Sequence, residues 1–221
     1  IDLYQLHWPD RPMSLFGGSI NYQHVEGDAN SIESILGALS ELIKIGKIRN
    51  IGLSNETPWG TMEFIHQSKD KDLPKMQSIQ NAYNLLNRIF EFGGSEIAFR
   101  ESVGLLAYSP LAQGYLTGKY QNGNLPKGSR KELFDRLQRY EGVGSEEAIE
   151  SYLNIAKKYN VDPSQLANQF VTTRPFVTSN IIGATSMEQL KLAVTSIEVN
   201  LTEEIENDIE KAFQKHGNVA S

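Results

Sequence analysis

The stretch KIRNIGLSN, residues 47–55, is a short apolar strand pattern that ends in two polar residues. Before it, residues 30–45 carry isoleucine and leucine at spacings of three and four, which predicts an amphipathic helix that stops at Gly46. After it, Thr57 caps a second predicted helix, with Pro58 at the first helical position. A strand flanked by two helices is the repeating unit of a parallel α/β fold.

The same alternation continues along the chain, and no two strands are joined by a hairpin turn. Five strands separated by helices indicate parallel β/α units, which build either an open doubly wound sheet or part of a barrel. The G-x-G-x-x-G phosphate loop of a Rossmann domain is absent, which weighs against the open sheet without settling the choice. The other predicted strands cover residues 2–6, 76–80, 103–110 and 176–182, and further helices cover 94–101 and 145–159.

Three helices are predicted in the last third of the chain. The first starts at Asp162-Pro163, where Gln165 completes a capping box, and the second follows the sequence GATS at residues 183–186. The last uses Ile205, Ile209 and Phe213 as its apolar face and runs nearly to Ser221. A stretch rich in Gly, Pro and Lys, residues 112–131, interrupts the alternation before them.

Composition narrows the class of protein. A net charge of -6 and a pI of about 5.3 argue against binding to nucleic acid or to an anionic membrane. The chain has no cysteine, which excludes disulfides, thiolate catalysis and cysteine zinc sites and fits a reducing compartment, so we expect a cytoplasmic protein. None of the four histidines forms a close pair, so no metal site is expected.

Polar residues stand where each predicted strand ends. In parallel α/β folds these carboxyl ends face the active site, because the loops after the strands gather there. Apolar strands that finish in amide, hydroxyl or aromatic side chains predict a polar, planar ligand. The strand ends are His7, Ser54-Asn55, Gln80-Asn81, Tyr108-Ser109 and Gly183-Ala184-Thr185.

Each strand end also has a purely structural explanation. His7 could be a hydrogen-bonded structural residue, and Ser54-Asn55 could cap the following helix. Gln80-Asn81 could be turn residues, and Tyr108 could pack at the rim of a barrel. The segment 183–189 could be only a capping box, since Ser186 and Gln189 have the required spacing. Recurrence at all five ends is what favours a binding site.

Five strings resemble the aldo-keto reductase superfamily, and most closely its Tas-like branch, which is related to the potassium-channel β subunits. They occur in family order and cover the whole chain. The resemblance implies a (β/α)8 TIM barrel, of which residues 1–221 would form strands 4–8 in a single, N-terminally incomplete domain. The strings are IDLYQLHWPDRP, GKIRNIGLSNET, IQNAYNLLNR, LLAYSPLAQGYLTGKY and IIGATSMEQL.

The family resemblance implies a reaction and assigns residues to it. It implies hydride transfer from NADPH to an aldehyde or ketone, with His7 polarising the carbonyl. The aspartate, tyrosine and lysine of the family's catalytic tetrad have no counterpart in these residues, so we expect residues 1–221 alone to be inactive. The implied cofactor contacts are Ser54, Asn55 and Gln80 at the carboxamide, Tyr108 against the ring, Ser109, Leu111, Gly114 and Lys119 along the pyrophosphate, Arg130 as a cofactor-binding arginine like that of the channel β subunits, and Gly183, Thr185 and Gln189 at the adenosine phosphate.

The resemblance leaves some properties open. Leu192-Ala193 replaces a Glu-Asn pair of many members, which predicts weaker or rearranged adenine recognition. The substrate is a small carbonyl compound whose identity depends on variable loops such as residues 10–29, and the oligomeric state is open. Two alternatives to the enzyme remain: a nucleotide-binding regulatory subunit like the channel β subunits, and a scaffold that has lost catalysis.

Overall fold

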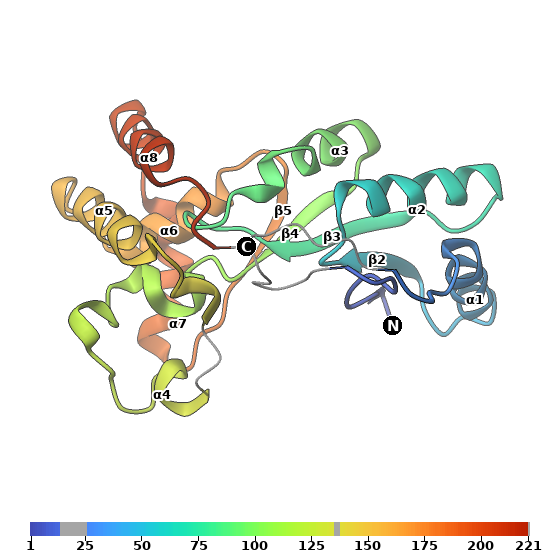
Figure 1. The fold of residues 1–221 in the computed structure, drawn as a ribbon, viewed down its shortest axis with the longest axis horizontal. Helices are drawn as coiled ribbons and strands as arrows, with labels where there is room; N and C mark the ends of the chain where they lie inside the picture. Colours follow the sequence, from blue (N-terminus) through green and yellow to red (C-terminus); the bar gives the residue numbers. More distant parts are fainter. Residues whose placement is uncertain (14–25, 135–137, 221) are drawn as a thin grey trace. The chain divides into compact units, whose positions relative to one another are not determined.

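The computed structural model describes residues 1–13, 26–134 and 138–220, and Figure 1 shows their alternation of strands and helices. The strands are β1 (Leu3–Gln5), β2 (Asn50–Ser54), β3 (Met76–Ala82), β4 (Gly104–Tyr108) and β5 (Val177–Ile181). The α-helices are α1 (Ile32–Lys44), α2 (Pro58–Asp70), α3 (Gly94–Glu101), α4 (Arg130–Phe134), α5 (Ser145–Lys158), α6 (Pro163–Thr172), α7 (Met187–Thr195) and α8 (Glu203–His216). Short 3-10 helices are η1 (Ile89–Glu91), η2 (Ala112–Thr117), η3 (Gln121–Gly123), η4 (Gln138–Tyr140) and η5 (Ser196–Glu198).

The strands form one sheet in the order β1-β2-β3-β4-β5, so each strand neighbours the next one along the chain. β1 pairs with β2 in parallel, with Tyr4 opposite Ile51. β2 pairs with β3 in parallel, and a register shift lies between Ile51 and Leu53. Parallel neighbours in sequence order, with helices between them, confirm the predicted α/β fold and are consistent with part of a (β/α)8 barrel.

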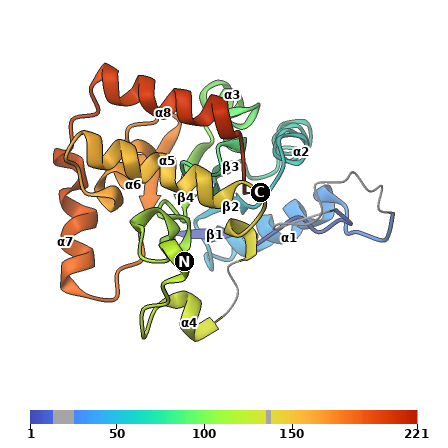
Figure 2. The same cartoon turned by 60° about the vertical axis from the view of Figure 1, so that its left-hand side comes forward.

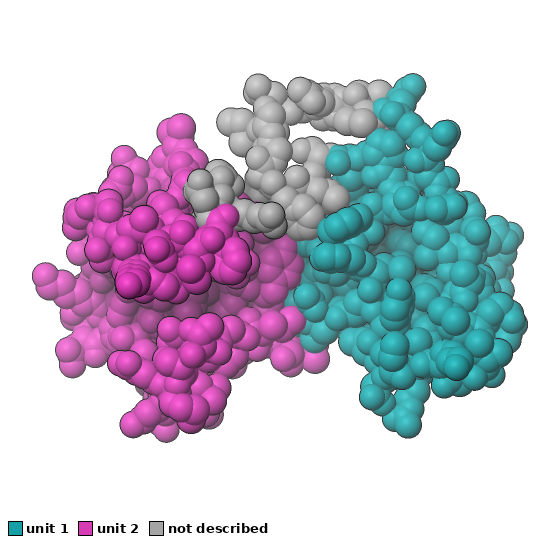
Figure 3. All heavy atoms as spheres, turned by 90° about the horizontal axis from the view of Figure 1, so that it is seen from below, with its two compact units in different colours: residues 1–81, 90–106 teal, residues 82–89, 107–221 magenta. Residues whose placement is uncertain are grey.

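The described residues divide into two compact units, coloured separately in Figure 3. Unit 1 comprises residues 1–81 and 90–106, and unit 2 comprises residues 82–89 and 107–221. In unit 1 the apolar faces of α1 and α2 pack together, and buried side chains of β2 and β3 complete the core. The unit 1 core includes Leu36, Leu39, Ile51, Leu53, Phe64, Ile65, Met76 and Ile79.

Unit 2 is built mainly from helices. α8 packs along α5, as Figures 1 and 2 both show, and α6 contacts α5, α7 and β5. The ring of Tyr83 is fully buried, with its centroid 5.8 Å from that of Phe170 and 5.2 Å from that of Phe176. Aromatic packing of this kind fixes the start of unit 2 against its helical core.

The predicted helix boundaries mostly agree with the structure, with two corrections. The last helix does not run nearly to Ser221, because α8 ends at His216 and Gly217 adopts a left-handed φ of 68°. At the start of α6, Asp162 accepts hydrogen bonds from the N–H groups of Ser164 and Gln165. The predicted capping box is not completed by Gln165, because its side chain donates to the Thr195 hydroxyl of α7 at 2.8 Å.

Candidate active site

Three neighbouring strand ends of unit 1 are joined by hydrogen bonds. The Ser54 hydroxyl donates to the Gln80 carbonyl oxygen at 2.7 Å, and the Asn55 N–H donates to the same oxygen at 3.0 Å. The Asn55 side-chain Nδ2 donates to the His7 carbonyl oxygen at 2.8 Å. We call His7, Ser54, Asn55 and Gln80 the strand-end cluster. The cluster brings together four of the residues that the sequence predicted for the nicotinamide end.

Asn55 holds an unusual backbone conformation at the centre of this cluster. Its φ is 55°, in the left-handed region that asparagine tolerates better than most residues with a side chain. The turn at Asn55 redirects the chain from the end of β2 towards α2. Helix α2 is capped by Thr57, whose hydroxyl accepts from the Gly60 N–H, so Ser54 and Asn55 are not the cap.

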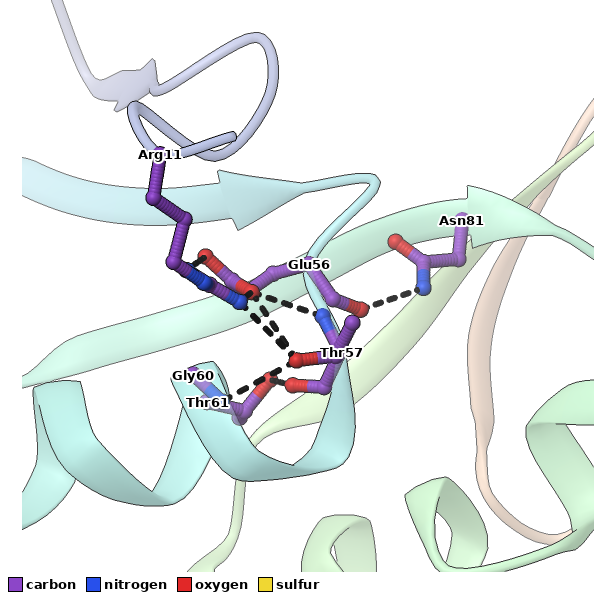
Figure 4. A network of polar contacts seen from close by, with 6 residues as sticks. All are labelled: Arg11, Glu56, Thr57, Gly60, Thr61 and Asn81. Carbon is purple, nitrogen blue, oxygen red and sulfur yellow. Dashed lines mark hydrogen bonds and ion pairs between the residues drawn. The ribbon is translucent and has the colours of Figure 1, made fainter. Parts of the chain in front are cut away.

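A buried ion pair lies next to the strand-end cluster, and sequence reasoning missed it. Figure 4 shows Arg11 reaching Glu56 with both guanidinium Nη atoms, at 3.0 Å to Oε2 and 2.5 Å to Oε1. The Glu56 side chain is only 2% exposed and that of Arg11 is 23% exposed. Glu56 also accepts from the Thr57 N–H at 2.7 Å. The signal available in the sequence was an acid directly after a strand end, but its partner lies 45 residues away.

The Arg11–Glu56 pair contacts β3 through Asn81, and the first turn of α2 packs closely against it at Gly60. Asn81 Nδ2, at the end of β3, donates to the Glu56 carbonyl oxygen at 3.0 Å (Figure 4). A Cβ added at Gly60 would overlap the Glu56 carboxylate and stand 2.7 Å from Arg11 Nη2. Glycine at this position is therefore what lets the first turn of α2 cover the ion pair.

In unit 2, the loop after β4 contains a series of left-handed residues. Ser109, Ala112 and Gln113 have φ values of 59°, 48° and 57°, and Gly114 has 105°. Backbone strain of this kind clusters at ligand clamps and active sites. The fully buried Asn84 holds the start of the loop, since its Nδ2 donates to the Ser109 carbonyl oxygen at 2.9 Å.

The cationic residues predicted for the phosphates lie on or after this loop. A Cβ added at Gly114 would come within 2.9 Å of Lys119 Nζ, so glycine leaves the space that this ammonium group occupies. Lys119 Nζ also lies 5.1 Å from the Tyr120 ring centroid. Arg130 is exposed and begins α4. Arg139 approaches the hydroxyl of the half-buried Tyr108 at 3.5 Å.

Next to Arg130, a coupled polar cluster joins α4 to the loop. Lys131 Nζ lies 2.5 Å from Glu141 Oε1, and the Tyr115 hydroxyl donates to the same carboxylate. Burial and the negative Glu141 raise the pKa of Tyr115 to about 12. The hydrogen bond from Lys131 and then that from Tyr115 lower the pKa of Glu141, while Glu141 raises the pKa of Lys131.

The segment 183–189 forms an exposed turn at the start of α7. Ser186 caps the helix and accepts from the Gln189 N–H at 3.2 Å. The Gln189 side-chain oxygen accepts from the N–H and hydroxyl of Thr185, at 2.9 and 3.1 Å. A Cβ at Gly183 would meet no atom within 4 Å, so the approach to the turn is open. Helix N-termini of this kind bind anions through their unpaired N–H groups.

The structure places the remaining predictions as follows. Leu111 and Ser109 are half-buried on the loop after β4, and Leu192 and Ala193 are half-buried in α7. Of the variable segment 10–29, residues 14–25 lie outside the described part of the chain. Within the described ranges, every helix falls short of what a membrane span needs, and no group of three His, Asp or Glu side chains is placed to hold a metal ion.

Comparison with known proteins identifies the family. The model of the aldo/keto reductase family matches residues 1–213. The chain is 46% identical over 215 residues to Protein tas of Escherichia coli strain K12, which covers 97% of this chain and 62% of that protein. It is 38% identical over 230 residues to an aldo-keto reductase of Babesia bovis, covering 97% and 81%. It is 31% identical over 191 residues to L-glyceraldehyde 3-phosphate reductase of E. coli, covering 83% and 54%.

The family model covers all five strands and every one of the predicted strings. The chain thus spans about three fifths of the length of Protein tas. Enzymes of the matched family act on small-molecule carbonyl compounds and generally use NAD(P)H. The chain belongs to the aldo/keto reductase family.

Proposed function

We propose that the whole protein is a cytoplasmic, NADPH-dependent oxidoreductase that reduces aldehydes or ketones to alcohols. The observation that carries this proposal is the strand-end cluster. Four residues of the types expected at a nicotinamide site lie at the carboxyl ends of adjacent parallel strands, where Ser54 and Asn55 donate hydrogen bonds to the backbone carbonyl oxygens of Gln80 and His7. In parallel α/β folds this end is where active sites lie.

The strand-end cluster suits a carboxamide, which offers two N–H donors and one carbonyl acceptor. The Ser54 hydroxyl donates to the Gln80 carbonyl oxygen and Asn55 Nδ2 donates to the His7 carbonyl oxygen, which holds a hydroxyl and an amide group at this edge of the sheet. The half-buried Gln80 side chain supplies both a donor and an acceptor. We assign Ser54, Asn55 and Gln80 to the carboxamide and Tyr108 to the face of the nicotinamide ring.

The phosphate end of the cofactor is assigned to unit 2. The strained loop supplies backbone groups at Ser109, Leu111 and Gly114, and Lys119 supplies a positive charge beside Gly114. Gly183, Thr185 and Gln189 offer an open helix N-terminus for the adenosine phosphate. Arg130, exposed and able to hold a phosphate with two parallel N–H groups, completes this set.

The chemistry divides between cofactor and protein. NADPH, when bound, supplies the hydride. His7, exposed at the end of β1, is assigned to donate a hydrogen bond to the substrate carbonyl oxygen, which makes the carbonyl carbon more electrophilic. The proton that completes the alcohol comes from a group outside residues 1–221 in this proposal, in one barrel domain shared with these residues.

The activity test is NADPH oxidation by the purified whole protein with an aromatic aldehyde. The expected result is aldehyde-dependent turnover, reduced ~100-fold or more in kcat/KM by His7→Ala, because positioned proton donors are worth ~10²–10⁴-fold. Cofactor affinity should change little, because His7 lies at the strand end rather than on the phosphate loop. No turnover with any aldehyde or ketone of a diverse panel would contradict the proposal.

The cofactor preference has a separate test. We expect NADPH to bind more tightly than NADH, and Arg130→Ala to remove ~10–100-fold of NADPH affinity, since a charge-assisted contact is worth roughly 1.5–3 kcal/mol. Lys127→Ala is the matched control, an exposed cation three residues away. Dissociation constants from fluorescence quenching give both results. Equal affinities in the parent protein would defeat the preference, and an unchanged ratio in the variant would defeat the role of Arg130.

A further inference from the structure

The residue after the strand-end cluster, Glu56, is tied to both neighbouring strand ends. Its carboxylate holds Arg11, which follows β1, and its carbonyl oxygen accepts from Asn81, the next-to-last residue of β3. Glu56 directly follows Asn55, whose left-handed backbone sets the direction of its side chain. A shift of the Glu56 backbone is therefore passed to Asn55 through the peptide bond that joins them.

Contacts at two places connect the chain after β1 to the chain after β2, and at the second of them Arg11 Nη2 also donates to the Thr57 hydroxyl at 3.0 Å. The first is the hydrogen bond from Asn55 Nδ2 to the His7 carbonyl oxygen, at 2.8 Å. The second is the two-pronged contact of Arg11 with Glu56, four residues beyond His7 and one residue beyond Asn55. A single hydrogen bond leaves the two segments free to pivot, whereas two adjacent contacts fix their relative direction.

Shape and charge make the second contact geometrically strict. Arginine and a carboxylate meet as two parallel N–H···O bonds in one plane, which specifies orientation as well as distance. The Glu56 side chain is 98% buried, and Gly60 closes over it so tightly that an added Cβ would displace the pair. The Arg11 guanidinium also lies 5.0 Å from the Trp59 ring centroid, in the same turn of α2.

We propose that Arg11, Glu56 and Gly60 are positioning residues that fix Asn55 and His7 relative to each other for hydride transfer. The inference rests on the proposed function, in which Asn55 orients the nicotinamide and His7 the carbonyl. Hydride transfer depends steeply on this geometry, since a misplacement of about 1 Å can cost ~100-fold in rate. In this proposal the three positioning residues act through Asn55 and His7.

The kinetic test compares Glu56→Gln, Arg11→Lys and Gly60→Ala with wild type in the whole protein. Glutamine keeps the shape of Glu56 but sets an NH2 group against the guanidinium, and lysine keeps the charge of Arg11 but loses the two-pronged contact. We expect kcat to fall ~10–100-fold in Glu56→Gln, by analogy with other misplaced reacting groups. The Kd for NADPH should stay within about threefold, because the phosphate contacts that dominate it lie elsewhere.

The matched control is Asp2→Asn. Asp2 pairs with Arg49 at 2.6 Å and joins the same two strands at their opposite ends, where both side chains are exposed. Its kcat and Kd should equal those of wild type. A loss of kcat and of NADPH affinity in equal measure in Glu56→Gln would indicate general disruption and would overturn the proposal, as would unchanged kcat in all three variants.

A second measurement does not depend on turnover. In whole protein labelled with ¹⁵N at asparagine, the Asn55 side-chain NH2 signals should shift and exchange faster with water in Glu56→Gln and Gly60→Ala, and stay in place in Asp2→Asn. Unmoved Asn55 signals would overturn the positioning role. If the wild-type protein reduces no carbonyl compound, the proposed function fails, while the NMR comparison still decides whether the pair positions Asn55.

Discussion

The two ends of the β1–β2 strand pair carry the same kind of contact in opposite surroundings. At the amino ends, Arg49 meets Asp2 at 2.6 Å with side chains that are 78% and 83% exposed. At the carboxyl ends, Arg11 meets Glu56 at 2.5 Å with exposures of 23% and 2%. Similar distances thus describe one pair that water surrounds and one that the protein encloses.

The difference in burial predicts a difference in how much stability is lost when one partner of each pair is removed. Exposed ion pairs gain little, because water screens the charges and the two side chains lose conformational freedom when they pair. A buried pair need not stabilise the fold more than apolar residues would, but losing one partner leaves a charge without compensation. Removing one partner should therefore lower the free energy of unfolding more at the buried pair than at the exposed one.

Removing one partner of the buried pair should lower the free energy of unfolding more than any other change considered below. Glu56→Ala leaves Arg11 beside an empty site and the Thr57 N–H without its acceptor, so we expect the free energy of unfolding to fall by ~3–5 kcal/mol. Urea denaturation of the whole protein, followed by circular dichroism, measures the change. A loss below about 1 kcal/mol would show that water compensates Arg11 as it does at the exposed end.

Adding a methyl group beside the buried pair, without removing a charge, should cause the second-largest loss of unfolding free energy. Gly60→Ala forces Glu56 or Arg11 to move, and overpacking of this kind costs ~1–3 kcal/mol. Gly37→Ala is the matched control, since a Cβ on this glycine in α1 meets nothing within 4 Å. The control should gain ~0.5–1 kcal/mol from helix propensity. A loss of unfolding free energy in Gly60→Ala together with a gain in Gly37→Ala would support close packing at the buried pair. A gain in both variants would contradict it.

The Lys131–Glu141 pair is intermediate in exposure, 33% for each side chain, and Tyr115 makes it sensitive to pH. Tyr115 keeps its proton more strongly in the folded protein, because its pKa is raised from 10.0 to about 12. Its contribution is therefore complete below pH 10 and is lost as the pH rises to about 12. Lys131, whose pKa is also raised, acts in the same direction.

The test of this intermediate pair compares wild type with Tyr115→Phe. The unfolding free energy of wild type should fall more steeply between pH 10 and 12, by on the order of 1–2 kcal/mol relative to the variant. Tyr4→Phe, at an exposed tyrosine, serves as the control and should follow wild type. Parallel curves of unfolding free energy against pH for wild type and Tyr115→Phe would show that Tyr115 does not cause the loss of stability at high pH.

The smallest change in unfolding free energy is expected at the exposed Asp2–Arg49 pair. Asp2→Asn and Arg49→Met should each change the unfolding free energy by less than ~0.5 kcal/mol, and the difference should shrink further in 0.5 M salt. Thermal melts at low and high salt measure it. A loss comparable to that of Glu56→Ala would mean that burial does not separate the two pairs.

Periodicity and strand-end chemistry predicted much of this molecule. The five strands, the amphipathic helix at residues 30–45 and the caps at Thr57 and Ser186 follow from contacts within a few residues, which sequence spacing encodes directly. A helix running nearly to Ser221 is longer than the observed α8, which ends at His216, before the left-handed Gly217.

The Arg11–Glu56 pair could not be predicted in the same way. Each residue has ordinary neighbours in sequence, and their contact exists only because parallel pairing of β1 and β2 brings the two following segments together. The same is true of Asn84, whose buried amide holds Ser109 and the Tyr140 hydroxyl through long-range contacts. Local patterns identify the residues of the strand-end cluster but not the side chains that hold it.

Asn55 shows how few substitutions such a position can accept. Its left-handed backbone admits glycine, asparagine and aspartate at low cost, while its bond to the His7 carbonyl oxygen requires a side-chain N–H group. Of these three residues, only asparagine has a side-chain N–H group. A homologue with glycine or aspartate here would keep the turn but lose the link to the histidine, and one with another amide or amine side chain would have to strain the turn to keep that link.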